Sequence, residues 1–283
     1  MRLPARLLLS LALAACACAP NEWGAAAILH PWRRPLTATP ALRHENVSFR
    51  SGDVTLRGWL FRSEAPRRGL IVYLHGIADN RQSVAGIAAH FVPRGFDVLA
   101  YDSRAHGLST GDACTYGYYE KGDLARALDT LGTDGAVLIG ASLGGAVALQ
   151  AAAEDPRILG VVAISPFADL DSIVHERAPW FLTSGFVDEA LTTAGRLGRF
   201  PPAEASPVRA AARVHAPVLL FYGARDRETL PTHSQRIFDA LAGPKELHAV
   251  PDAGHNDVLA HQESWKVIDR WIEGVARESG HAR

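Results

Sequence analysis

Hydrophobic and polar positions follow a regular alternation from residue 47 onward. The stretch NVSFRSGDVTLRGWLFR alternates apolar and polar side chains around Ser51-Gly52-Asp53, which predicts a two-stranded antiparallel hairpin. Short apolar runs follow it, each brief enough to be a buried strand. These runs cover residues 69–75, 96–102, 136–140, 159–165, 217–223 and 245–250.

Segments with helical spacing separate these runs and follow the last of them. They cover residues 82–92, 118–131, 143–154, 233–241 and 258–276. Strands that are apolar almost throughout, alternating with helices, are typical of a parallel sheet covered by helices on both faces. We therefore expect an α/β fold with a mostly parallel, eight-stranded sheet, in which only the first hairpin is antiparallel.

Residues 166–205 interrupt this alternation with a tract that contains PWFLTSGFVDEAL. A loop of that length without structure of its own is uncommon in a compact domain. We expect a small helical cap here, inserted after the sixth strand. Four of its apolar side chains either line a pocket or pack within the cap: Trp180, Phe181, Leu182 and Phe186.

The N-terminus has a different character from the rest of the chain. MRLPAR carries two arginines, LLLSLALAA is apolar, and the order basic, apolar, small is typical of a secretory signal peptide. The apolar stretch is shorter than the roughly 20 residues that span a bilayer. The sequence LAAC that ends at Cys16 resembles a bacterial lipobox, in which the cysteine becomes the lipidated first residue of the mature protein. An ordinary cleaved signal peptide is the alternative.

These features predict a signal peptide over residues 1–15 and a lipid anchor on Cys16 that holds the protein to a membrane. The predicted location is the cell envelope, on the periplasmic side of a bacterial membrane. Residues 16–46 are rich in Pro and Ala without a clear period, so we expect a tether and an approach segment. The globular domain then spans residues 47–276, and residues 277–283 form a C-terminal tail.

Composition narrows the classes of function. The chain has 283 residues, and 48% of them are hydrophobic, which suits one globular domain with a sizeable core. Lys plus Arg total 29 against 30 for Asp plus Glu, and this balance argues against a nucleic-acid partner. The three cysteines form no CxxC motif and have no zinc-ligand spacing, so neither a metal nor redox chemistry is expected.

A serine flanked by glycines follows the predicted strand 136–140. Gly140, Ser142 and Gly144 satisfy the pattern Gly-x-Ser-x-Gly between a strand and a helix. A tight turn alone explains such glycines, so the pattern needs partners elsewhere in the chain. Ligands of parallel sheets bind at the carboxyl ends of the strands, and the partners are therefore expected there.

Two other strand ends supply these partners. A serine hydroxyl needs a base to remove its proton, and the base needs an acid to orient it. Asp226 in FYGARDRETLP follows the seventh strand, and His255 in VPDAGHNDVL follows the eighth. The competing acid is Asp169 after the sixth strand, and the competing bases are His248, inside a strand, and His261, in the last helix.

An oxyanion hole requires backbone N–H groups aimed at the developing charge. Leu143 directly follows the candidate nucleophile at a helix N-terminus, and its N–H is the first expected donor. The second is expected from the loop after the third strand, where Gly76 allows a sharp turn and Ile77 offers its N–H. We expect His75 to anchor this loop through hydrogen bonds.

With these residues in place, the chain resembles serine hydrolases of the α/β-hydrolase superfamily over residues 47–276. The matching segments are LHGIADN, YDSRAHGLSTGD, GASLGG, YGARD and DAGHND. The most similar groups by pattern are small-cap esterases, lipases, acyl-protein thioesterase-like enzymes and serine aminopeptidase-like hydrolases. The resemblance implies a catalytic triad of Ser142, Asp226 and His255, an acyl-enzyme intermediate, and no cofactor or metal.

The expected activity is hydrolysis of a small carboxylic ester or thioester. An apolar cap favours an acyl chain as part of the substrate. A serine peptidase of the aminopeptidase type is the alternative within enzymes, although no acidic cluster that would hold a substrate amino group is evident. A lipoprotein that keeps the fold only as a binding scaffold is the alternative outside enzymes.

Overall fold

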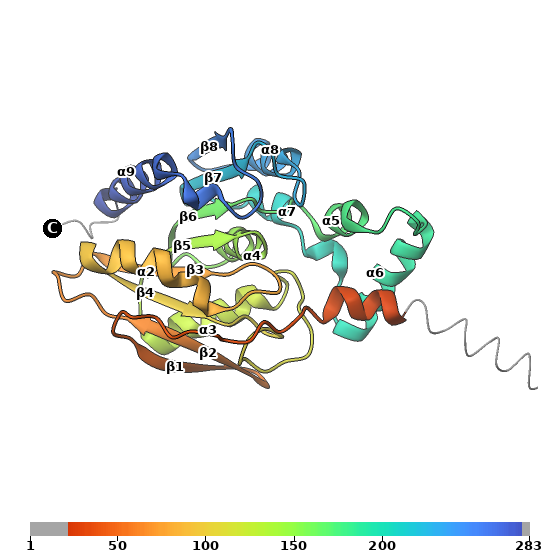
Figure 1. Ribbon diagram of the computed structural model, residues 1–283, viewed down its shortest axis with the longest axis horizontal. Helices are drawn as coiled ribbons and strands as arrows, with labels where there is room; N and C mark the ends of the chain where they lie inside the picture. The colour runs from red at the N-terminus through yellow and green to blue at the C-terminus, as the bar shows by residue number, and fades with distance from the viewer. Residues whose placement is uncertain (1–21, 279–283) are drawn as a thin grey trace, which may run out of the picture.

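The structure is a computed structural model, and it describes residues 22–278. One eight-stranded sheet with the order β1-β2-β4-β3-β5-β6-β7-β8 runs through the molecule (Figure 1). Its strands are β1 Glu45–Ser51, β2 Val54–Phe61, β3 Gly69–Leu74, β4 Phe96–Tyr101, β5 Ala136–Ala141, β6 Ile158–Ile164, β7 Val218–Gly223 and β8 Lys245–Val250.

The strand directions confirm the expected sheet. Strand β1 pairs with β2 in antiparallel register, with Val47 opposite Gly58, and β2 pairs with β4 in the same sense. Every other pair is parallel, from β4 and β3 across to β7 and β8. The carboxyl ends of β3, β5, β6, β7 and β8 therefore meet at one edge of the sheet.

Helices cover both faces of the sheet, as the alternating pattern predicts. They are α2 Ala85–Phe91, α3 Glu120–Leu131, α4 Leu143–Ala152, α5 Leu170–Arg177, α6 Ser184–Gly198, α7 Pro207–Ala211, α8 Pro231–Ala240 and α9 Gln262–Glu278. Short 3-10 turns join them: η1 Arg81–Val84, η2 Val92–Arg94, η3 Pro202–Glu204 and η4 Val258–Ala260.

The apolar core is divided into two layers by the period-2 geometry of the strands. In β3, Ile71 and Tyr73 face the layer formed with α2 and α9, while Val72 and Leu74 face the layer formed with α3 and α4. Strands that are buried on both faces must be apolar at successive positions. This requirement explains the continuous apolar runs in the sequence.

Helices α5 and α6 lie between β6 and α7 and project beyond one end of the sheet (Figure 1). Asp169 begins α5 by accepting a hydrogen bond from the Ser172 backbone N–H at 2.8 Å. The Thr183 side chain caps α6 in the same way. We refer to α5 and α6 as the cap.

Part of the segment expected to be a tether is an ordered helix. Residues 22–29 form this helix, which packs against α6 (Figure 1). Gly24 is essential to the contact, because a Cβ atom added there would lie 2.8 Å from the Cβ of Ala190. The helix buries Ala25, Ile28 and Leu29 in the core layer that α3 and α4 share. The hydrophobic effect thus favours docking of this segment over a free tether.

Several features predicted from the sequence lie on residues outside the described range. These are the signal peptide at residues 1–15, Cys16, and residues 279–283 of the expected tail. Helix α9 extends through the first residues of that tail and ends at Glu278. None of the helices within residues 22–278 is long and apolar enough to cross a membrane.

Candidate active site

Ser142 occupies a strained turn between β5 and α4. Its backbone has φ 50° and ψ −113°, outside the regions that residues other than glycine ordinarily adopt. The Ser142 N–H donates a 2.8 Å hydrogen bond to the Ile164 carbonyl of β6, which holds the turn against the sheet. Such a backbone costs about 1–3 kcal/mol, and residues of this kind cluster at functional sites.

The flanking glycines are required by close approach of the backbone. A Cβ atom on Gly140 would lie 2.3 Å from the Gly144 carbonyl oxygen, and one on Gly144 would lie 2.0 Å from the Leu74 carbonyl oxygen. Both distances are far below any tolerable contact. The Gly-x-Ser-x-Gly pattern therefore reflects packing of β5, α4 and β3 around the turn that presents Ser142.

Asp226 and His255 meet at the carboxyl ends of β7 and β8. The Nδ1 atom of His255 lies 2.7 Å from Oδ2 of Asp226. The other carboxylate oxygen of Asp226 accepts the backbone N–H groups of Glu228 and Thr229, each at 2.9 Å. Asp226 is buried, so its orientation and that of His255 are both fixed.

The charge of Asp226 is supported by these donors. Burial alone would raise the pKa of the Asp226 carboxyl, but the hydrogen bonds from His255 and from the Thr229 and Glu228 backbone outweigh it and hold that pKa below its ordinary value. The carboxylate is consequently ionised at neutral pH. An ionised carboxylate on Nδ1 fixes the histidine tautomer that leaves Nε2 free to accept a proton.

The competing acid and bases lie elsewhere. Asp169 forms an ion pair with Arg236 of α8 at 2.6 Å and caps α5, so it does not contact His255. His248 stays in β8, 3.1 Å from Glu246 and in ring contact with Phe221. His261 follows η4 at the start of α9.

The two expected oxyanion donors flank Ser142. Leu143 is the first residue of α4, so its N–H has no acceptor within that helix. Within residues 22–278 the N–H of Ile77 also has no hydrogen-bond acceptor. The sharp turn in this loop occurs at Ala78, with φ 55°, and Gly76 does not have a left-handed backbone. The expectation that Gly76 makes the turn is therefore wrong.

Two histidines in edge-to-face contact, His75 and His106, support the loop that carries Ile77. His75 accepts the Ser103 N–H at Nε2 over 3.0 Å, while its Nδ1 lies 2.7 Å from the Gly76 carbonyl oxygen. The ring centroid of His106 lies 5.1 Å from that of His75. Burial lowers the pKa of both imidazoles, that of His106 to about 3. Both rings are neutral at physiological pH.

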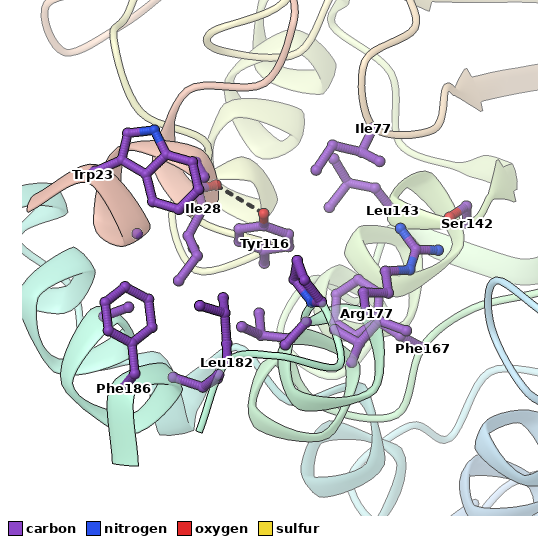
Figure 2. A pocket seen from close by; sticks show the side chains of 18 residues that line it. Trp23, Ile28, Ile77, Tyr116, Ser142, Leu143, Phe167, Arg177, Leu182 and Phe186 are labelled. Carbon is purple, nitrogen blue, oxygen red and sulfur yellow. Dashed lines mark hydrogen bonds between the residues drawn. The ribbon is translucent and has the colours of Figure 1, made fainter. Parts of the chain in front are cut away.

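A cavity of about 360 Å³ begins at Ser142 and runs beneath the cap (Figure 2). We call it the apolar cavity; the core, the cap and helix 22–29 each supply a wall. Its lining includes Trp23, Ile28, Ile77, Tyr116, Leu143, Phe167, Ile173, Leu182 and Phe186. Its volume lies at the lower end of the roughly 300–1,000 Å³ common for small-molecule sites.

The cap aromatics divide between two environments. Leu182 and Phe186 line the apolar cavity, which is one of the two roles that the sequence left open for them. Trp180 is 94% exposed and Phe181 is 65% exposed, and neither side chain lines the cavity. These two residues lie in the turn between α5 and α6, where no neighbouring element covers them.

A second cavity of about 510 Å³ meets the first one at Ser142. We call it the polar cavity. His255 lines this cavity, together with Asp79, Glu228 and Asn256. Arg177, at the C-terminus of α5, lines both cavities, as do Ser142 and Ile77.

Neither Arg177 nor the wall formed by helix 22–29 is predicted by the patterns in the sequence. Arg177 donates from Nε to the Glu228 carbonyl at 2.9 Å and from Nη2 to Thr229 Oγ1 at 3.1 Å. Its role depends on the placement of the cap, which no local pattern encodes. For the helix, the short apolar run GAAAIL at residues 24–29 is a usable signal.

One group of side chains has ligand atoms close enough to surround a cation. The ligand atoms of Asp171, His175 and Asp188 lie within 4.8 Å of one another on the surface of the cap. His175 already lies 3.2 Å from Asp188 and 3.8 Å from Asp171. These contacts link α5 to α6 and account for the cluster without an ion.

Comparison with known proteins places this architecture in a family. A model of the alpha/beta hydrolase fold matches residues 69–206. The chain is also 30% identical over 225 residues to the uncharacterized protein Rv2307c of Mycobacterium tuberculosis, an alignment that covers 77% of this chain and 74% of that protein. The protein belongs to the α/β-hydrolase family. The expected fold class is thereby confirmed, and the fold supports a hydrolase that acts on a small molecule.

Solved structures of other α/β-hydrolases have the same architecture. The Pyrococcus furiosus esterase Pf2001 superposes with a TM-score of 0.70 at 26% identity, covering 88% of this chain and 98% of that one. The Pyrococcus horikoshii acylaminoacyl peptidase superposes with a TM-score of 0.62 at 15% identity, covering 77% of this chain and 38% of that one. The second likeness is one of fold alone.

Proposed function

We propose that this α/β-hydrolase cleaves carboxylic esters or thioesters through a catalytic triad of Ser142, His255 and Asp226. One observation carries the proposal: Ser142 and His255 line the same cavity, and His255 bonds through Nδ1 to the buried Asp226 carboxylate. A serine on a strained turn, a histidine and a fixed acid together supply the groups that acyl transfer requires.

In the first step His255 accepts the Ser142 hydroxyl proton at Nε2 as the oxygen attacks the substrate carbonyl carbon. The negative charge that develops on the carbonyl oxygen is stabilised by the N–H groups of Ile77 and Leu143. Asp226 remains ionised and stabilises the imidazolium.

In the second step the bond to the leaving group breaks, and His255 returns its proton to the leaving oxygen or sulfur. The acyl group is then bonded to Ser142. Water, deprotonated by His255, attacks this acyl-enzyme by the same route, releases the carboxylic acid and restores the Ser142 hydroxyl.

The lining of the apolar cavity favours an ester over an aminopeptidase substrate. An aminopeptidase must hold a charged substrate ammonium close to the scissile carbonyl. No Asp or Glu of the described residues lines the apolar cavity, and its single charged residue, Arg177, has the same sign as an ammonium. An uncharged acyl chain suits this surface, and similarity to the Pf2001 esterase agrees with that choice.

Labelling with a fluorophosphonate probe and a panel of nitrophenyl esters tests the proposal. The wild-type protein is expected to label and to prefer acyl chains longer than acetyl, and Ser142→Ala is expected to lose both activities while it remains folded. Ser165→Ala is a suitable control, because Ser165 also follows a strand and has a positive φ of 47° but lies outside both cavities. Absence of labelling in the wild type would favour a binding scaffold, and preference for aminoacyl amides would favour a peptidase.

A further inference from the structure

The two cavities that meet at Ser142 suit different halves of an ester, one the acyl chain and the other the leaving group. During acyl transfer the leaving group must reach the histidine that protonates it, whereas the acyl chain must point away from that histidine. His255 lines the polar cavity, and among the described residues it is not part of the apolar cavity lining. The acyl chain therefore belongs in the apolar cavity and the leaving group in the polar cavity.

Arg177 lies where the apolar cavity and the polar cavity meet. Its side chain lines both cavities, and in Figure 2 its guanidinium extends toward the Ser142 end of the apolar cavity. The bonds to the Glu228 carbonyl and to Thr229 Oγ1 hold the guanidinium beside the loop that carries Asp226. These partners use Nε and Nη2, and Nη1 donates to no acceptor in the described part of the chain.

The charge of Arg177 is not matched by a protein carboxylate. Both of its hydrogen-bond acceptors are uncharged, and it forms no ion pair within residues 22–278. The other cation that lines the polar cavity, Arg34, is paired with Asp79 at 3.1 Å. The remaining carboxylate of that cavity, Glu228, is exposed and lies 3.5 Å from the Asn256 amide.

We propose that Arg177 is a specificity-determining residue that selects esters with an anionic leaving group, bearing a carboxylate or a phosphate, and binds that anion through its free Nη1 group. The inference rests on the proposed ester hydrolysis. A planar guanidinium already fixed by two hydrogen bonds binds an oxyanion with little further loss of side-chain freedom. The anion stays in the polar cavity while the uncharged acyl chain occupies the apolar cavity.

Two hexanoyl esters that differ by one charge test this directly. The first has 4-nitrophenol as its leaving group, and the second has 3-carboxy-4-nitrophenol. The wild type is expected to show a kcat/KM at least about tenfold higher for the carboxylated ester, chiefly through a lower KM, which corresponds to about 1.4 kcal/mol. Added salt is expected to reduce this preference, because the contact is between charges near solvent.

Four variants distinguish the effect of the Arg177 charge from the effect of its structural contacts. Arg177→Gln is expected to bring the ratio of the two kcat/KM values close to one through a larger loss on the carboxylated ester than on the neutral one, and Arg177→Lys is expected to retain part of the preference. Thr229→Val removes one tether of the guanidinium but keeps its charge, so the preference is expected to survive. Glu228→Gln is expected to increase the preference for the carboxylated ester, because the substitution removes a carboxylate that repels an anion from the polar cavity.

The outcomes distinguish this inference from the proposed function. If the wild type hydrolyses both esters equally in a Ser142-dependent reaction, the role of Arg177 is wrong and ester hydrolysis stands. A preference for a carboxylate on the acyl chain, measured with a hemisuccinate ester, would overturn the assignment of the two cavities. If neither ester is hydrolysed and the fluorophosphonate does not label Ser142, the proposed function fails first.

Discussion

The hydroxyl of Tyr116 donates a 2.8 Å hydrogen bond to the backbone carbonyl of Ile28, and this bond fixes helix 22–29 to the loop below the cap (Figure 2). Both residues line the apolar cavity. This bond therefore holds in place the wall that the N-terminal segment contributes to the apolar cavity.

Tyr116→Phe is expected to loosen this wall. Loss of a buried hydrogen bond costs about 1 kcal/mol of stability, and the kcat/KM for nitrophenyl octanoate is expected to fall while that for the acetate is retained. Tyr119→Phe is the matched control, because its hydroxyl donates to the Arg199 carbonyl over 2.5 Å but does not line the cavity. Equal effects of Tyr116→Phe on both esters would contradict a role for this wall in acyl binding.

Gly144→Ala is expected to unfold the turn that presents Ser142. The new Cβ atom would lie 2.0 Å from the Leu74 carbonyl oxygen, and a rigid backbone contact of this kind costs more than about 3 kcal/mol. Urea unfolding measures the loss. Gly122→Ala, in α3 with no neighbouring atom within 4 Å, is the control and is expected to stabilise the protein by about 0.5–1 kcal/mol.

Asp226→Asn is expected to lower kcat by a factor of about 10³–10⁴ without loss of fold, because an amide does not hold His255 in the required tautomer. Steady-state hydrolysis of a nitrophenyl ester measures the effect. Asp169→Asn is the matched control: it removes the Arg236 ion pair and weakens the α5 cap, and it is expected to leave kcat unchanged. A large loss of kcat from Asp169→Asn instead would show that the acid had been misassigned.

The sequence predicts where the buried strands end, because each of them is a short continuous apolar run. It also predicts that the residues after these strands lie close together, because the carboxyl ends of parallel strands meet at one edge of the sheet. That reasoning, together with the Gly-x-Ser-x-Gly pattern, the need for a base and an acid, and the resemblance to serine hydrolases, selected Ser142, Asp226 and His255. Arg177 was not selected, because its place at the site depends on how α5 packs against the loop after β7, a contact between segments about 50 residues apart in the chain. Helix 22–29 was missed for a related reason: its stability comes from packing against α6 and not from its own short apolar run.

The sequence prediction for Cys16 is tested by mass analysis of the mature N-terminus after expression in a bacterial host that processes lipoproteins. We expect cleavage before Cys16, acyl chains on that cysteine, and loss of incorporated alkyne-labelled fatty acid in Cys16→Ala. Cys18→Ala is the control and is expected to retain the label. A mature chain that begins at another residue and carries no lipid would indicate an ordinary signal peptide.

His106 is expected to make the stability of the protein fall as the pH drops below about 6.5, where an unfolded histidine gains a proton. It is fully buried, its Nδ1 lies 2.8 Å from the Arg104 carbonyl oxygen, and its Nε2 has no hydrogen-bond partner within residues 22–278. Burial and the neighbouring His75 lower the His106 pKa to about 3, so between these two pH values only the unfolded state is protonated.

The slope from one such group is about 1.4 kcal/mol for each pH unit, so moving from pH 7.5 to pH 5 is expected to cost about 2 kcal/mol through His106. The lowered pKa of His75 acts in the same direction. Urea unfolding at the two pH values measures the difference, and His106→Gln is expected to reduce it by about 2 kcal/mol. His215→Gln, at an exposed histidine, is expected to leave the difference unchanged. An unaltered pH dependence in His106→Gln would mean that the His106 ring accepts its proton without unfolding.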